Sequence, residues 1–341
     1  MITIGLLVFV LSRVELGKVI DDMQQANLLY VLLAVLFFVA AILTNAFKWG
    51  VLLRAQQVEV PWSALIGYTF VGTFFSSFLP AAIGGDVMRG YGLARYTNRN
   101  ADAAVSVIVD RLIGTIMLAG MAVIAVLYAQ VEQVAGSANL TATFWGALGV
   151  TVAFLGAFFV MVSRRLREGG GQVLAGLAER LPFLRPFVPI YENLSKAIGA
   201  YRHQPKAILL ALAIGAFTWI FSNLVNYLLS LSLPPAPDGL SPISLLDIFI
   251  FNPIVGLTQA LPISIGGLGA NQTFYEVFYH HWSGYNKEHV TATSLLMQFV
   301  VYICSLPGGV IWWFDRGQPT QEEEQQPEEP EEPATQNAMH L

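Results

Sequence analysis

A short motif occurs twice in this chain, and both copies end an apolar run. Residues 79–85 read Leu-Pro-Ala-Ala-Ile-Gly-Gly, and residues 261–267 read Leu-Pro-Ile-Ser-Ile-Gly-Gly. Proline lacks a backbone N–H and fixes φ, whereas consecutive glycines permit conformations closed to other residues. Each copy therefore predicts a break in a helix. The residues expected to make the two breaks are Pro80, Gly84 and Gly85 in the first copy and Pro262, Gly266 and Gly267 in the second.

The composition indicates the surroundings of these breaks. The 341 residues are 55% hydrophobic and 12% charged, with a mean hydropathy of +0.58. This balance is typical of a polytopic membrane protein rather than a soluble enzyme. Non-helical backbone at membrane depth is tolerated only where it is buried in protein or lines a polar cavity. We therefore expect the two breaks to form walls of one site; the alternative is two loops at the bilayer surface.

The charged and sulfur-containing residues exclude several classes of partner. The formal net charge is −5, but seven glutamates lie within residues 322–332, and removing their charges leaves +2. Nothing in this balance suggests nucleic acid binding. The single cysteine, Cys304, rules out an intrachain disulfide, and the five histidines show no metal-ligand spacing. We expect no nucleic acid partner, no metal and no cofactor.

Several apolar runs are long enough to cross a bilayer at about 1.5 Å per residue. The expected full spans are 28–53, 101–129, 143–162, 207–231 and 290–314. Two further elements are interrupted by the repeated motif, namely 62–79 with 87–96 and 245–261 with 268–278. Residues 2–11 are apolar but short, either a short first span or the remainder of a longer one. Lys48 and Arg54, near the end of the first full span, can snorkel to an interface.

Positive charge sets the expected orientation. Residues 130–142 contain no Lys or Arg, whereas residues 163–206 contain eight. The positive-inside rule places the basic segment in the cytoplasm, with 130–142 and 232–244 outside. Apolar residues at helical spacing within the basic segment predict an amphipathic helix along the membrane face, namely Ile190, Leu194, Ile198 and Tyr201. We expect a multi-pass cell-membrane protein with a cytoplasmic tail.

Counting crossings from the basic segment gives the two broken elements opposite senses. The first enters from the cytoplasmic side and the second from the outside, and a full span precedes and follows each. This is an inverted-topology repeat of span, re-entrant broken helix and span, which is a mark of transporters. The expected fold is an all-α polytopic membrane protein over residues 1–317. Its repeat halves are about 28–129 and 207–314, its linker is 163–206, and its disordered acidic tail is 318–341.

Four ionisable residues near the first break are candidate site residues. Asp86 can cap the helix after Gly85 and can also line the site. Arg89, one turn further on, can pair with Asp86, or its planar fork can contact a phosphate. Asp110, next to Arg111, lies roughly 13 Å into its span, where an unpaired carboxylate is costly, so we expect it to pair with an arginine of the broken element. The uncharged polar counterparts in the second half are Asn252, Gln259, Asn271 and Gln272.

These motifs together resemble a known family, the lysylphosphatidylglycerol synthase transmembrane family. The resembling residues are Pro80, Gly84-Gly85-Asp86, Arg89, Asp110-Arg111, Leu261-Pro262 and Gly266-Gly267-Leu268-Gly269. The resemblance covers nearly all of residues 1–316 and implies a multi-pass protein that handles lipid, with lipid translocation as its activity. No aminoacyl-transferase domain accompanies these motifs, so we expect no synthesis of lysyl lipid. Family members often carry Arg-Glu where this chain has Asn271-Gln272, so a charge-dependent role is not expected there.

Helix N-termini supply the expected mechanism. A half-helix that begins near the midplane presents unpaired N–H groups and the positive end of its dipole, and the repeat brings two such ends together. They can hold a lipid phosphate while the acyl chains stay in the bilayer. No Walker motif occurs, so the predicted function is flipping of an anionic phospholipid or phosphate-linked glycolipid without ATP hydrolysis. The predicted binding residues are Gly84, Gly85, Asp86, Arg89, Asp110, Arg111, Gly266, Gly267, Asn271 and Gln272.

Two other functions stay open at this point. A metal-dependent membrane enzyme acting on lipid phosphates would use Asp86 and Asp110 as ligands, although the sequence has no dense acidic or histidine cluster. A non-catalytic scaffold for a lipid-modifying enzyme or glycosyltransferase would use the acidic tail for docking. A second copy of the chain and a lipid-synthesising enzyme are the candidate protein partners.

Overall fold

The computed structural model describes residues 16–79, 83–131, 163–180, 187–237, 239–259 and 266–315, with a few positions between 149 and 156. All helices and turns discussed below lie in this part of the chain. Five expectations fall on residues outside it. They concern the apolar segment 2–11, the helix-breaking residues Pro80 and Pro262, most of the span 143–162, and the tail 318–341.

Four of the expected spans are helices in the structure. They are α3 (Leu28–Ala55), α6 (Asn100–Val131), α10 (Pro205–Ser232) and α13 (Lys287–Asp315). Each contains a stretch long and apolar enough to cross a membrane. Their predicted ends differ from the observed ends by only a few residues. These helices confirm the predicted class, an all-α polytopic membrane protein.

The two interrupted elements are also helical on both sides of the motif. The first consists of α4 (Trp62–Phe78) and α5 (Ile83–Thr97), and α4 ends where Leu79 takes an extended conformation. The second consists of α11 (Leu245–Gln259), α12 (Ala270–Tyr275) and a π-helical turn (Glu276–Trp282) that continues α12. The predicted interruption of both elements is therefore confirmed.

The glycine pairs of the two motifs have different roles. Gly266 and Gly267 have φ values of +57° and +78°, in the left-handed region that favours glycine, and they form the turn before α12. By contrast, Gly84 and Gly85 lie inside the first turn of α5, so the expectation that this pair forms the break is wrong. Gly85 is needed for a close helix contact, because a Cβ there would lie 2.1 Å from the carbonyl oxygen of Gly72 on α4.

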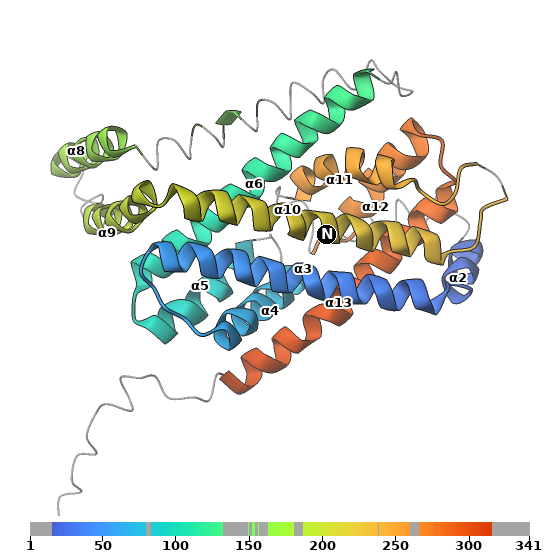
Figure 1. Cartoon of the computed structure of the whole chain (residues 1–341), viewed down its shortest axis with the longest axis horizontal. Coiled ribbons are helices and arrows are strands. Elements are labelled where there is room, and N and C mark those ends of the chain that lie inside the picture. The colour runs from blue at the N-terminus through green and yellow to red at the C-terminus, as the bar shows by residue number, and fades with distance from the viewer. Residues whose placement is uncertain are drawn as a thin grey trace, which may run out of the picture.

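Helices α3 and α10 form the central pair of the molecule and lie side by side along their length (Figure 1). They run antiparallel, because the N–H of Asn27, the cap of α3, donates to the carbonyl oxygen of Ser232 at the end of α10 at 2.7 Å. Near their middle, Thr218 Oγ1 donates to Thr44 Oγ1 at 2.9 Å. The first spans of the two repeat halves thus contact each other head to tail.

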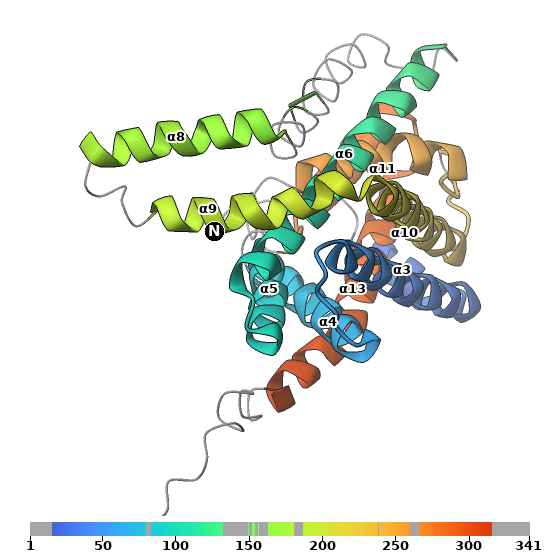
Figure 2. The same ribbon diagram turned by 60° about the vertical axis from the view of Figure 1, so that its left-hand side comes forward.

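The two halves exchange their last spans. Helix α13 of the second half packs along α4 of the first, and α6 of the first half packs along α11 of the second (Figures 1 and 2). Glycines permit both contacts: a Cβ on Gly308 would lie 2.0 Å from the Phe70 carbonyl oxygen, and one on Gly256 would lie 2.9 Å from Leu118 Cδ2. Two copies of one unit related by a twofold axis would give this reciprocal packing.

Three further helices lie around this bundle. They are α2 (Leu16–Gln24), α8 (Arg164–Arg180) and α9 (Phe187–Gly199), which continues as a 3₁₀ turn (Ala200–His203). The helix predicted between Ile190 and Tyr201 is confirmed, and it packs on α6 with Tyr201 buried. Helix α8 packs on α9, away from the bundle (Figure 2). The position of α9 along the membrane face stays a prediction.

Candidate functional site

Five ionisable side chains from three helices form a continuous chain of ion pairs in the first half. Lys48 Nζ on α3 lies 3.1 Å from Asp110 Oδ1 on α6, and Arg89 Nη2 on α5 lies 2.9 Å from Asp110 Oδ2. Arg89 Nη2 also lies 3.3 Å from Asp86 Oδ1, while Arg111 Nη1 lies 2.6 Å from Asp86 Oδ2. Each carboxylate therefore lies between two cations. We refer to these five residues as the ion chain.

Helical spacing explains how the sequence assembles the ion chain. Asp86 and Arg89 are three residues apart on α5 and so lie on one face. Asp110 and Arg111 are neighbours on α6 and point in directions about 100° apart, so Asp110 reaches Lys48 while Arg111 reaches Asp86. The expected pair between Asp110 and an arginine of the first broken element is confirmed.

The expectation for Lys48 is wrong. Its side chain does not extend to an interface, because it is buried against Asp110, with only 7% of the residue exposed. If Lys48 extended to the interface, Asp110, which is only 4% exposed, would lose one of its two cationic partners. Burying a charge is costly unless it is paired, so the pair is favoured over solvation of the ammonium group.

Arg89 occupies the centre of the ion chain and is held from several sides. Its guanidinium carbon lies 4.6 Å from the ring centroid of Trp49, and Trp49 Nε1 donates to Ser106 Oγ at 3.0 Å. Gly72 of α4 lies beside the arginine, since a Cβ there would make an ordinary contact of 3.4 Å with Arg89 Cβ. Arg89 is 4% exposed and paired with two carboxylates. The sequence left two roles open for Arg89, an ion pair with Asp86 or contact with a phosphate, and the geometry shows the ion pair.

The opposite end of the ion chain opens into a groove between α5 and α6. The side chains of Asp86 and Arg111 are 23% and 35% exposed, in contrast to the buried Lys48 end. The groove has a volume of about 590 Å³. Apart from Asp86, Arg111 and Asn100, its walls are apolar side chains, a tyrosine and a glycine, namely Val87, Gly90, Tyr91, Ala94, Ala104, Val107, Ile108 and Leu112. We refer to it as the lateral groove.

The ion chain carries an excess of positive charge. It combines the cations Lys48, Arg89 and Arg111 with the carboxylates Asp86 and Asp110, which gives a formal charge of +1. Interactions with this charge are weakly screened where the surroundings are apolar. An anion is therefore the complementary ligand at the exposed end, in the lateral groove.

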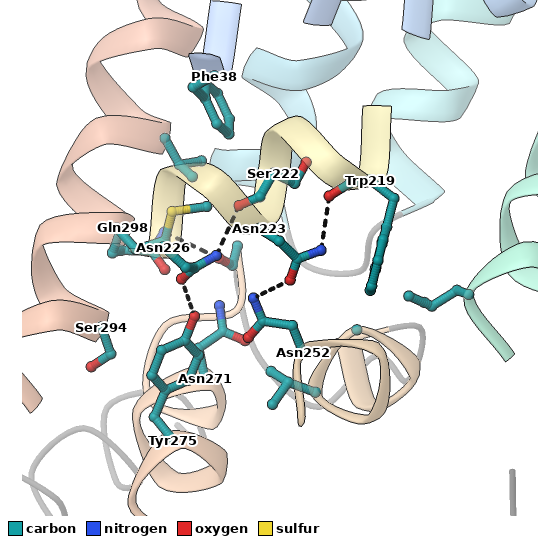
Figure 3. Close-up of a pocket in the computed structure, with 16 residues that line it drawn as sticks. Phe38, Trp219, Ser222, Asn223, Asn226, Asn252, Asn271, Tyr275, Ser294 and Gln298 are labelled. Carbon is teal, nitrogen blue, oxygen red and sulfur yellow. Dashed lines mark hydrogen bonds between the residues drawn. The ribbon is translucent and has the colours of Figure 1, made fainter. Parts of the chain in front are cut away.

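A second polar site lies in the other half of the molecule. A cavity of about 350 Å³ is enclosed by α10, α11, α12 and α13, with contributions from α3 and α6 (Figure 3). Its polar wall consists of uncharged side chains, namely Ser222, Asn223, Asn226, Asn252, Asn271, Tyr275, Ser294 and Gln298. Phe38 and Trp219 are among its apolar lining residues. We refer to it as the amide cavity.

Hydrogen bonds between helices hold the wall of the amide cavity in place. Asn252 Nδ2 donates to Asn223 Oδ1 at 2.9 Å, and the hydroxyl of Tyr275 donates to Asn226 Oδ1 (Figure 3). Gln298 Nε2 donates to the carbonyl oxygen of Gly266 at 3.1 Å. These bonds tie α10 to α11 and α12, and α13 to the turn before α12.

The predicted residues of the second motif separate into two groups. Asn271 and Gly266 line the amide cavity. Gln272 instead stabilises the turn before α12, since its Oε1 accepts from the N–H of Gly269 at 2.7 Å. The turn also contacts the first broken element, because a Cβ on Gly266 would lie 2.2 Å from the carbonyl oxygen of Ser77 on α4. The two broken elements therefore contact each other here, while Asp86 of the first lines the lateral groove and Gly266 of the second lines the amide cavity. That the two breaks form walls of one site stays a prediction.

The buried end of the ion chain lies close to the amide cavity. A Cβ on Gly114 of α6 would lie 3.9 Å from Lys48 Nζ, and one on Gly215 of α10 would lie 3.7 Å from Lys48 Cδ. Leu118 and Trp219, four residues further along these helices, line the cavity. Lys48 and the cavity wall are thus about one helical turn apart, or about 5.4 Å along the helix axis.

Sequence reasoning missed several residues of these sites. The sequence pattern predicts that Lys48 reaches an interface, and it does not single out Asn223, Asn226 or Gln298. The sequence does carry a signal for these residues, namely polar side chains within otherwise apolar spans. Such side chains are costly in a membrane and usually face the protein interior. Asn223 and Asn226 are also three residues apart on α10, which places them on one face.

The fold and the two polar sites define a class, a multi-pass membrane protein whose broken helices meet inside an all-α bundle. The chain belongs to a known family within this class, because the model of the lysylphosphatidylglycerol synthase TM region matches residues 1–308. The resemblance noted in the sequence is thereby confirmed. Within the described part of the chain, no three His, Cys, Asp or Glu side chains come together as they would to hold a metal ion.

Two archaeal proteins are among its relatives. A UPF0104 membrane protein of Methanothermobacter thermautotrophicus is 24% identical over 280 residues, which are 78% of this chain and 79% of that protein. A UPF0104 membrane protein of Pyrococcus horikoshii is 25% identical over 131 residues, which are 38% of this chain and 39% of that protein. The family fits a membrane role related to lipid.

Proposed function

We propose that this protein moves an anionic phospholipid or a phosphate-linked glycolipid between the leaflets of the cell membrane, without ATP hydrolysis and without chemical change to the lipid. One observation carries the proposal. The cationic ion chain is partly exposed at Asp86 and Arg111, and there it opens into a lateral groove with mostly apolar walls. A lipid phosphate with its acyl chains has the same combination of charge and apolar surface.

Arg111 is the proposed contact for the phosphate. Its guanidinium group is the more exposed cation of the chain, whereas Arg89 and Lys48 are buried against Asp110. Arginine offers a planar fork of N–H donors that matches a phosphate, and such charge-assisted bonds are short and strong. Asp86, which accepts from both arginines, holds Arg111 in position while no phosphate is present.

The proposed path of the lipid phosphate across the membrane passes the point where the two broken elements contact each other. The phosphate enters at the lateral groove while the acyl chains stay in the bilayer along α5 and α6. The proposed path then follows the ion chain toward Lys48 and the turn at Gly266. We also propose that residues 163–206 and the tail face the cytoplasm, from the positive-inside rule.

The test is reconstitution into liposomes with a labelled phosphatidylglycerol and a labelled polyprenyl phosphate, followed by quenching from outside. In protein-free liposomes only the outer-leaflet label is quenched promptly, so we expect the protein to cause additional loss of the inner-leaflet label for at least one of the two lipids. Arg111→Ala should slow movement by roughly 10–100-fold, because hydrogen bonds to charged groups contribute about 1.5–3 kcal/mol. Arg111→Lys keeps the charge but loses the planar fork of donors, so its rate of lipid movement should lie between those of the wild type and Arg111→Ala.

Arg54→Ala is the matched control. Arg54 is an exposed arginine on α3 whose guanidinium carbon lies 4.7 Å from the Trp62 ring centroid, and it lines neither the groove nor the ion chain. The Arg54→Ala variant should move lipid at the wild-type rate. If neither lipid moves faster than in protein-free liposomes, the proposal is wrong and the scaffold function is favoured. A folded Arg111→Ala variant with wild-type transport would exclude the lateral groove as the path.

A further inference from the structure

The amide cavity carries hydrogen-bonding groups but no charge. Among its described lining residues there is no Asp, Glu, Lys or Arg, although the ion chain lies about one helical turn away. Four asparagines and one glutamine instead supply amide N–H donors and carbonyl acceptors. Primary amides can donate and accept at the same time, as hydroxyl groups do. The cavity is therefore complementary to a neutral group that bears several hydroxyls.

The amides are held in fixed orientations and keep unused capacity. Asn252 donates to Asn223 (Figure 3). It also accepts from the Tyr279 hydroxyl at 2.8 Å, and the two bonds together fix the orientation of its side chain. An amide group has two N–H bonds and two acceptor lone pairs, so these contacts occupy only part of what each side chain offers. A ligand would meet a preformed wall and would not have to order it.

One buried atom points directly to a missing partner. Asn271 Oδ1 is buried and has no hydrogen-bond partner among the described residues, and Asn271 lines the cavity. A buried acceptor without a donor costs about 1–3 kcal/mol, and native structures contain few of them. Because this oxygen has almost no accessible surface, a hydroxyl of a bound molecule would supply the donor after the Asn271 side chain turns toward the cavity.

We propose that the amide cavity binds the neutral, hydroxyl-bearing headgroup of the transported lipid, such as glycerol, inositol or another sugar. The inference rests on the proposed function for the path, because the ion chain runs from the lateral groove to Lys48, about one helical turn from the cavity wall. It goes beyond that function by naming the headgroup class. A headgroup with an ammonium group would find no carboxylate in this wall, so cationic headgroups are disfavoured.

Lipid binding to the purified protein, measured by native mass spectrometry, tests this inference separately from transport. The probes are phosphatidylinositol and phosphatidylglycerol, which carry hydroxylated neutral headgroups, phosphatidic acid, which has no headgroup, and phosphatidylserine, whose headgroup is charged. We expect phosphatidylinositol to be retained about tenfold over phosphatidic acid and phosphatidylserine, because two or three additional hydrogen bonds contribute that much.

Asn271→Leu should reduce this preference to within about twofold. Asn271→Asp, nearly identical in shape, should shift retention toward lysylphosphatidylglycerol, whose headgroup carries ammonium groups. The matched control is Asn45→Leu, which removes an amide from α3 that does not line the cavity and should keep the wild-type preference.

The outcomes separate the inference from the proposed function. Equal retention of phosphatidylinositol and phosphatidic acid by the wild type would show a cavity that holds only water and would overturn the inference. An unchanged preference in a folded Asn271→Leu variant would place the headgroup elsewhere and also overturn it. A clear headgroup preference in a protein that moves no lipid in liposomes would support the headgroup site and contradict the proposed function.

Discussion

The substitution Asp110→Asn tests the central ion pair most directly. Asp110 accepts from Arg89 at 2.9 Å and lies 3.1 Å from Lys48 Nζ, and all three residues are less than 10% exposed. Asparagine keeps the size of the side chain and removes its charge. Asp86 would then be the one carboxylate left for three cations in the ion chain, and Lys48 would lose its ion-pair partner in the described structure.

The expected loss of stability follows from this geometry. Removing one partner of a buried pair costs about 3–5 kcal/mol, because the other charge stays buried without compensation. A protein with a stability of about 5–15 kcal/mol would lose a large part of it. We expect the melting temperature of the detergent-purified protein to fall by roughly 5–10 °C. Size-exclusion chromatography of samples heated to a series of temperatures would measure this fall.

A second substitution distinguishes charge balance from simple loss of a contact. Lys48→Met in the Asp110→Asn background removes the cation that lost its partner and restores the formal charge of the ion chain to +1. The double variant should regain more than half of the lost stability, as coupled neighbours do in a double-mutant cycle. Wild-type melting of Asp110→Asn, or losses that simply add in the double variant, would refute the reasoning.

Two other predictions concern packing and topology. Gly85→Ala places a Cβ 2.1 Å from the Gly72 carbonyl oxygen and should destabilise the protein by about 1–3 kcal/mol, whereas Gly120→Ala, with nothing within 4 Å, should melt as the wild type does. Equal melting of the two variants would contradict the close contact of α4 and α5. In a Cys304→Ser background, Ser137→Cys should react with an impermeant thiol reagent in intact cells and Gly170→Cys should not. The reverse labelling pattern would invert the proposed orientation.

The repeated motif was informative because its chemistry is local. A proline fixes φ and removes an N–H, and two glycines permit conformations closed to other residues, so a break in each element could be predicted without knowing any neighbour. The role of each glycine pair could not be predicted. Gly85 and Gly267 each follow an Ile-Gly pair, yet Gly85 contacts the backbone of α4 and Gly267 adopts a φ of +78°.

The pairing of the charged residues was partly predictable for a related reason. Asp86 and Arg89 lie one turn apart, so their contact depends on α5 alone. The depth of Asp110 in its span predicts an arginine of the first broken element as its partner, and in the structure that arginine is Arg89. Lys48 could not be assigned, because its contact with Asp110 depends on how α3 packs against α6. The amide cavity depends in the same way on the packing of several helices.

The exchange of last spans has a consequence for biosynthesis. Helix α4 ends at Phe78, but α13, the helix that packs along it, begins only at Lys287. At about 5–20 residues per second, a ribosome finishes α13 roughly 10–45 s after α4. During that interval the first broken element is in the membrane without the helix that packs along it. Neither half translated alone could complete its own interior, so a gene split within residues 132–162 should give stable protein only when both pieces are made in the same cell.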